Sequence, residues 1–169
     1  MSNKIVHASA QTGQAYWGPG DLYVFLVTGE ESGGSYFTME ARVPPGGGPP
    51  PHIHHREEEQ FYILEGEVTL HAAEQTIHAS VGDFVHVPRG TVHAFRNAGK
   101  LPARMLVTYS PAGIEKLFER VFPRADDRMA PPPSPSKEML ARFGELEAEY
   151  GLETIRTDGS GTSLNADEY

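Results

Sequence analysis

Turn-forming residues divide the first two-thirds of the chain, and their spacing constrains the fold more than any other feature. Gly, Pro or Gly-Asp recurs at intervals of about eight to twelve residues, and β-branched and aromatic residues fill the segments between. This rhythm is typical of an all-β protein built from short strands. We predict strands over 21–28, 35–43, 51–55, 59–64, 67–72, 75–79, 83–87, 92–97 and 103–109.

After Tyr109 the apolar residues change from a period of two to helical spacing. Ser110 can cap a helix over about 111–122, and Pro111 suits its first turn. One face of this helix would then carry Ile114, Leu117, Phe118, Val121 and Phe122. A packed helix is therefore expected to follow the last strand.

A proline-rich linker comes next, and it contains too much proline for regular structure. Ser134 and Pro135 then open a second predicted helix over about 135–150, and Gly151 is its expected end. The last segment, 157–169, is small, polar and acidic without periodicity, which predicts disorder.

The composition fits one globular domain. The chain has 169 residues, of which 38% are hydrophobic, enough for a single core. We expect one mainly β domain over 1–156, with its barrel at about 15–110 and the two helices after it.

Charge and residue usage exclude several classes of function. The formal net charge of −9 argues against nucleic acid and anionic membranes as partners. No apolar run is long enough to span a bilayer, and the first residues lack the apolar centre of a secretory signal, so we expect a cytoplasmic protein. Cysteine is absent, so a metal would have to bind nitrogen and oxygen ligands.

The stretch "PPPHIHHREEEQFYILEG" places histidines just before a strand-forming run. His52 and His54 are two residues apart on an extended segment, so both imidazoles point to the same face. Glu59 begins the next run and alternates with Phe61 and Ile63, which buries its carboxylate. A metal ion would offset the cost of that buried charge. If the bend falls one residue earlier, Glu58 takes the place of Glu59.

A second segment, "GDFVHVPRGTVHAFRN", supplies a further imidazole. A strand, a Pro88-Arg89-Gly90 turn and another strand bring back His93, with Phe95 on the same face. The two segments together indicate a metal site much more strongly than either alone.

With these residues, the chain resembles the cupins, whose two sequence motifs converge on a metal inside a small barrel. Every motif position has the residue that the family pattern requires. The first motif is represented by Gly46, His52, His54, Glu59 and Gly66, and the second by Gly82, Pro88, Gly90, His93 and Asn97.

The resemblance implies a double-stranded β-helix, or jelly roll, holding one divalent transition metal per chain. It implies His52, His54, Glu59 and His93 as ligands and a structural role for Asn97. Iron, nickel and manganese are favoured, and cobalt, copper and zinc also suit imidazole and carboxylate ligands.

A narrower likeness, from about residue 13 to 155, is to small bacterial cupins grouped with quercetin 2,3-dioxygenase. It implies ring opening of a flavonol-like, enolisable substrate by dioxygen, with Glu59 as ligand and general base. Two other functions stay open. One is a non-redox isomerase, cyclase or decarboxylase, with Glu59 or His86 moving protons, and the other is a binding protein without turnover.

Other residues have both a structural and a functional interpretation. Six apolar side chains share the inward alternation and would form either core or a substrate pocket, namely Phe37, Met39, Phe61, Ile63, Phe95 and Met105. His86 is either a pocket residue beside the metal or an ordinary sheet histidine. Glu57 and Glu58 are interpreted as solvated. The C-terminal helices would cap the barrel mouth or cover a sheet face. We also predict a homodimer formed through sheet edges or the N-terminal strand.

Overall fold

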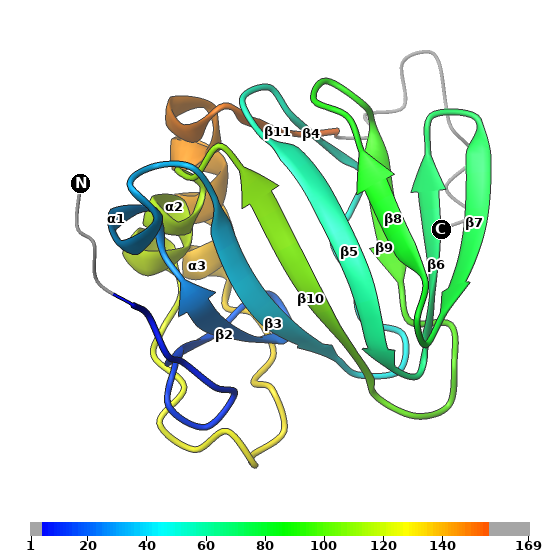
Figure 1. The fold of residues 1–169 in the computed structure, drawn as a ribbon, viewed down its shortest axis with the longest axis horizontal. Coiled ribbons are helices and arrows are strands. Elements are labelled where there is room, and N and C mark those ends of the chain that lie inside the picture. The colour runs from blue at the N-terminus through cyan, green and yellow to red at the C-terminus, as the bar shows by residue number, and fades with distance from the viewer. Residues whose placement is uncertain (1–4, 156–169) are drawn as a thin grey trace.

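A computed structural model describes residues 5–155, and its strands form two antiparallel sheets (Figure 1). The mainly β jelly-roll architecture predicted from the sequence is confirmed. The larger sheet runs, neighbour by neighbour, through β1 (Gln14–Trp17), β2 (Leu22–Val27), β3 (Phe37–Val43), β10 (Ala103–Ser110), β5 (Glu58–Glu65) and β8 (Phe84–Val87). The smaller sheet runs through β11 (Leu152–Thr154), β4 (His52–His54), β9 (His93–Arg96), β6 (Glu67–Ala72) and β7 (Gln75–Ser80).

Alternating burial along the strands builds the core between the sheets. In β10 every second side chain is buried, and Val107 and Tyr109 pair with Phe61 and Glu59 of β5. The same pairing therefore turns Phe61 and Glu59 inward. Phe61 packs edge to face against Phe95 of the smaller sheet, with ring centroids 5.7 Å apart. This contact joins the two layers into one core.

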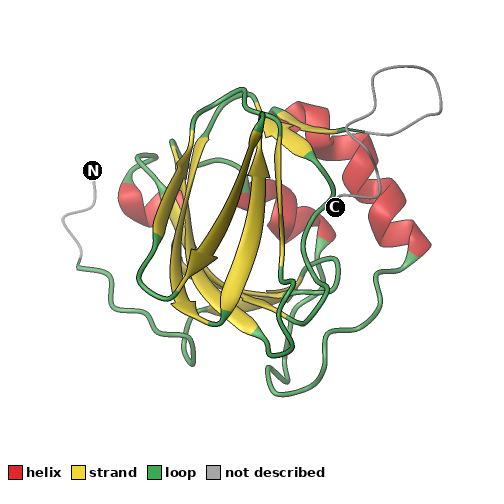
Figure 2. Cartoon of the chain, turned by 90° about the vertical axis from the view of Figure 1, so that its right-hand side faces the viewer, coloured by secondary structure: helices red, strands yellow, loops and turns green. Residues whose placement is uncertain are grey.

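The helices gather beside the strands rather than between the sheets (Figure 2). Two of them, α2 (Glu115–Val121) and α3 (Lys137–Leu146), lie near the β1, β2 and β3 side of the larger sheet (Figure 1). The remaining elements are α1 (Gly29–Ser32) and the 3-10 helix η1 (Glu147–Tyr150). None of the helices in residues 5–155 has both the length and the apolarity needed to cross a membrane.

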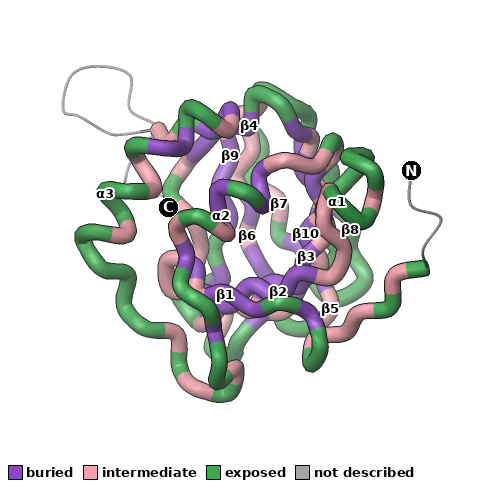
Figure 3. Tube along the Cα trace, turned by 90° about the vertical axis from the view of Figure 1, so that its left-hand side faces the viewer, coloured by how far each residue is buried: buried purple, intermediate pink, exposed green. Residues whose placement is uncertain are grey.

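Aromatic contacts attach the helices to the core. Phe118 of α2 contacts Tyr23 of β2, with ring centroids 5.8 Å apart. Phe122 stacks on Phe143 of α3 at 5.6 Å and 5° between planes. Most of α3 is exposed or only partly buried (Figure 3), and Leu146 is its one buried residue. The second helix is therefore held mainly by this aromatic face.

Both predicted helices start later than expected. Ser110 does not cap α2, because it continues β10 and pairs with Glu58. Ser136, two residues after the predicted Ser134, caps α3 by accepting a hydrogen bond from the Met139 N–H at 3.0 Å.

The end of the helical region agrees better with expectation. Gly151 follows η1 with a left-handed φ of 74°, a backbone conformation that glycine adopts without strain. The short strands β1 and β11 were not predicted from the sequence. The predicted disordered segment, 157–169, lies outside the described residues.

Candidate metal centre

Four buried side chains from both sheets meet inside the barrel. Strand β4 directs His52 and His54 inward, with Ile53 facing the other way. His93 of β9 lies opposite His52 in the smaller sheet, and Glu59 comes from β5 of the larger sheet. One nitrogen or oxygen of each residue lies within 4.8 Å of the others. The structure therefore brings together the four side chains that the two motifs singled out.

One carboxylate oxygen is the focus of this cluster. Glu59 Oε2 lies 2.7 Å from His93 Nε2, 3.4 Å from His54 Nε2 and 3.9 Å from His52 Nε2. Three ring nitrogens of the same kind thus point toward one oxygen. This arrangement differs from a chain of paired hydrogen bonds, in which each group would have its own partner.

Backbone carbonyls orient two of the imidazoles. His52 Nδ1 lies 3.0 Å from the Pro50 carbonyl oxygen, and His93 Nδ1 lies 2.9 Å from the Thr91 carbonyl oxygen. Because a carbonyl only accepts, each Nδ1 carries a proton and donates it. In the neutral ring, Nε2 then presents a lone pair to Glu59. A lone pair and a carboxylate oxygen at 2.7 Å need a proton or a metal cation between them.

The electrostatics of the cluster suit a cation. Burial lowers the pKa of His52 to about 3, so this imidazole is neutral and able to donate its lone pair. Burial opposes ionisation of Glu59, yet the hydrogen bond of His93 and the nearby histidine charges lower its pKa to about 2. Burial also opposes protonation of His93, but Glu59 raises the pKa of His93. One carboxylate and three imidazoles, with the shared proton of His93 lost on binding, form a donor set that fits a divalent transition metal.

Glu57 is a functional candidate for which the sequence-based interpretation is wrong. It is buried rather than solvated, at 2% exposure. Its Oε2 lies 3.7 Å from Nδ1 of His54, and both atoms are buried without a hydrogen-bond partner in the part of the chain that the structure describes. A carboxylate behind a histidine ligand orients the ring and strengthens its donor nitrogen. Glu58, the alternative ligand, is outside the cluster of four.

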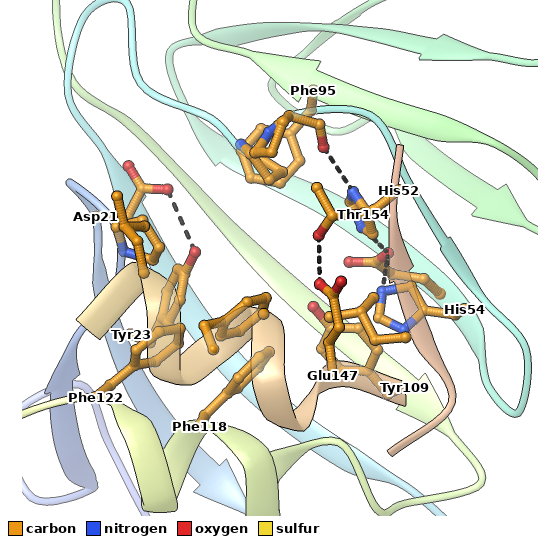
Figure 4. Close-up of a pocket in the computed structure, with 18 of the residues that line it drawn as sticks. Asp21, Tyr23, His52, His54, Phe95, Tyr109, Phe118, Phe122, Glu147 and Thr154 are labelled. Carbon is orange, nitrogen blue, oxygen red and sulfur yellow. Dashed lines mark hydrogen bonds and ion pairs between the residues drawn. The ribbon is translucent and has the colours of Figure 1, made fainter. Parts of the chain in front are cut away.

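A cavity of about 670 Å³ opens from this centre and has a largely aromatic wall (Figure 4). Its lining includes His52, His54 and Glu59. Away from these three residues the lining includes Asp21, Tyr23, Met39, Phe95, Tyr109, Phe118, Phe122, Phe143, Glu147 and Thr154. Helices α2 and α3 contribute to the wall, which supports the interpretation that they close the mouth of the barrel.

The predicted pocket residues fall into three groups. Met39 and Phe95 line the cavity. Four others are buried in the core away from the lining, namely Phe37, Phe61, Ile63 and Met105. His86 is exposed, because β8 turns its neighbours Val85 and Val87 inward. The prediction of His86 as a pocket residue is therefore wrong.

Asn97 has hydrogen bonds that match a structural role. Its Nδ2 donates to the carbonyls of Val43 and Leu101, each at 2.9 Å. Its Oδ1 accepts from the Gly99 N–H at 2.9 Å. The side chain is fully buried, so these bonds tie the end of β9 to the end of β3.

Comparison with known proteins agrees with this geometry. The Cupin domain family matches residues 39–109. Quercetin 2,3-dioxygenase of Bacillus subtilis is 33% identical over 75 residues, 44% of this chain and 22% of that protein. The chain thus matches about a fifth of the length of this curated relative.

Two solved structures show that the same fold occurs in known proteins. A predicted oxalate decarboxylase from Thermotoga maritima has a TM-score of 0.58 at 21% identity, covering 64% of this chain and 99% of its own. The polyketide cyclase RemF from Streptomyces resistomycificus has a TM-score of 0.56 at 24% identity, covering 63% of this chain and 80% of its own. Fold and site together define a jelly roll with a buried histidine and glutamate centre. The family match over residues 39–109 and the shared fold support membership of the cupin superfamily.

Proposed function

We propose that this cupin is a metal-dependent dioxygenase acting on a flavonol-like or other enolisable aromatic compound. The observation that carries the proposal is the cluster of His52, His54, Glu59 and His93 at one wall of a large aromatic cavity. The resemblance to quercetin 2,3-dioxygenase of Bacillus subtilis supports the same reaction class.

The proposed cofactor is one divalent transition metal per chain, held by the four clustered residues. Iron, nickel and manganese are the first choices, and cobalt, copper and zinc fit the same donors. When bound, such a metal supplies a Lewis acid for an enol oxygen and a route for electrons to dioxygen.

The protein's own groups then position the substrate and accept its proton. Glu59 is ionised at neutral pH, because its pKa is lowered to about 2, so it is able to take the enol proton. Phe95, Phe118 and Phe122 line the cavity and offer apolar contact to a flat aromatic substrate. A cavity of about 670 Å³ lies within the size range of small-molecule sites.

Non-redox chemistry is the second candidate. The polyketide cyclase and the predicted oxalate decarboxylase share this fold, but both are under 25% identical to this chain, so the likeness concerns the fold alone. The same ligands would also hold a metal that polarises a carbonyl without consuming dioxygen.

Elemental analysis followed by oxygen uptake with a flavonol panel separates the candidates. The proposal expects about one metal per chain and uptake in step with flavonol loss. His93→Ala should abolish uptake, and His86→Ala, at an exposed histidine, should leave it unchanged. Full metal loading without uptake would contradict the dioxygenase proposal and favour the non-redox one. Binding of a flavonol without any product would point to a binding protein.

We also propose a homodimer formed at a sheet edge. Strand β8 is an edge of the larger sheet, and Phe84 on it lies opposite Tyr62 of β5. These two aromatic side chains are 64% and 41% exposed. Light scattering should give twice the chain mass of 18.5 kDa, and Phe84→Glu should reduce it to a single chain. A single-chain mass for the unaltered protein would contradict the dimer.

A further inference from the structure

A buried carboxylate lies across the cavity from the histidines. Asp21 precedes β2, is only 1% exposed and lines the cavity. Figure 4 shows Asp21 and Tyr23 on the opposite side of the cavity from His52 and His54. The metal centre therefore does not use Asp21, and no motif in the sequence accounts for it.

Asp21 has an unsatisfied acceptor. Its Oδ2 accepts a long hydrogen bond of 3.4 Å from the Tyr23 hydroxyl, and its Oδ1 is buried with no hydrogen-bond partner among residues 5–155. The backbone at Gly47 lies close to this oxygen, since a Cβ added there would lie 2.9 Å from it. A buried carboxylate oxygen without a hydrogen bond lowers the stability of the folded state, so the presence of Asp21 here calls for a functional explanation.

The other polar pair on the wall is already satisfied. Thr154 donates a hydrogen bond of 2.6 Å to Glu147 Oε2. A ligand would have to break this bond in order to use it, whereas Asp21 Oδ1 has no partner among the described residues to displace. Of these two carboxylates, Asp21 is thus the better acceptor for a ligand.

Between the two polar ends the wall is aromatic. Phe118 and Phe122 stack with centroids 5.2 Å apart and 20° between planes, and Phe143 continues the stack. Such aromatic side chains supply apolar contact for a flat ligand, and the polar groups at the ends then select its substituents.

We propose that Asp21, held by Tyr23, is a specificity-determining subsite that accepts a hydrogen bond from a hydroxyl on an aromatic ligand, at the end remote from the metal. The statement that Asp21 lies at the end remote from the metal rests on the proposed function. The raised pKa of Asp21, about 7 because of burial, agrees with a carboxylate that awaits a donor.

The subsite predicts a preference between two matched probes. Calorimetric titration of the zinc-loaded protein should show that 2-naphthol binds about tenfold more tightly than 2-methoxynaphthalene, which cannot donate. Asp21→Ala should abolish the preference and change the affinity for the methoxy compound less than about twofold. Asp126→Ala, at an exposed aspartate, serves as the control and should retain the preference.

Two outcomes would overturn the subsite. One is equal affinity of the two probes for the unaltered protein, and the other is a preference that persists in Asp21→Ala, because the hydroxyl would then be recognised elsewhere. If Asp21→Ala does not fold, Tyr23→Phe provides the test, since loss of the hydroxyl that holds the carboxylate should lower the preference at least threefold. An unchanged preference in Tyr23→Phe would then reject the proposal. These titrations involve no turnover, so failure of the dioxygenase assay leaves their result intact.

Discussion

The two ends of the cavity are built differently. At the end with His52, His54, Glu59 and His93, called the metal end below, paired strands position the side chains. At the Asp21 end, two helices and a carboxylate with one long hydrogen bond form the wall. His52 and His93 are neighbours in one sheet, and backbone carbonyls orient both rings. Within the described residues, the Asp21 side chain has one hydrogen bond, of 3.4 Å. The clustered histidines thus have more contacts that fix their positions than Asp21 has. Variants at each end should therefore change different properties.

The largest effect is expected from Glu59→Ala. This change removes the one carboxylate of the donor set and leaves His93 without its buried partner. We expect bound metal after dialysis to fall from about one per chain to less than a tenth, as measured by elemental analysis. Glu58→Ala, on the same strand but outside the cluster, is the control. Retention of metal in Glu59→Ala would mean that the centre lies elsewhere.

At the other end, Phe118→Ala should destabilise the fold without removing the metal. The Phe118 ring is buried against Tyr23, Tyr109 and Phe122. Truncation of a buried phenylalanine costs about 3–5 kcal/mol in free energy of unfolding, which denaturant titration measures. Loss of metal from the folded Phe118→Ala variant would show that metal binding depends on the helical wall as well as on the strands.

Asp21 should make stability depend on pH. Burial raises the pKa of Asp21 from 3.8 to about 7 in the folded protein. Between these values the unfolded chain ionises Asp21 while the folded protein keeps it protonated, so stability falls as the pH rises and stays lower above pH 7. The unaltered protein should lose on the order of 2–4 kcal/mol in free energy of unfolding between pH 4 and pH 8, as measured by denaturant titration. Asp21→Asn should remove this loss. Parallel pH profiles of the two proteins would contradict the raised pKa.

The smallest effect is expected from Glu57→Gln at the metal end. Glu57 lies beside His54 but outside the cluster of four, so Glu57→Gln should lower the affinity for the metal without abolishing metal binding. Competition with a chelator should show about tenfold weaker binding. Affinity equal to that of the unaltered protein would limit Glu57 to packing.

Alternation explains why most of the barrel could be predicted from the sequence. In β5 and β10 every second residue is buried, so apolar runs such as "EQFYIL" fix both the strand and its inward face. The two motifs place their histidines and glutamate on such faces, so their convergence followed from strand geometry. The short strands β1 and β11 lack this signal, because each has only a few residues and takes its register from a neighbour.

The residues that were missed or misassigned have local reasons. Glu57 lies in the bend between β4 and β5, where a period of two does not apply. His86 lies on a strand with apolar residues on both faces, and its pairing with Gln60 turns it outward. For Asp21 a signal existed, since it alternates with Tyr23 and Phe25, both of them buried. An aspartate in register with inward aromatic residues could have marked the second end of the cavity.

The pairing of β11 with β4 has a consequence for how the protein is made. β4 carries two of the clustered histidines, yet its only paired position with β9 is His52 with His93. Three more pairs come from β11, which the ribosome produces after the whole barrel and both longer helices. The strand that carries His52 and His54 therefore keeps an open edge until β11, the last element of the described residues, is in place.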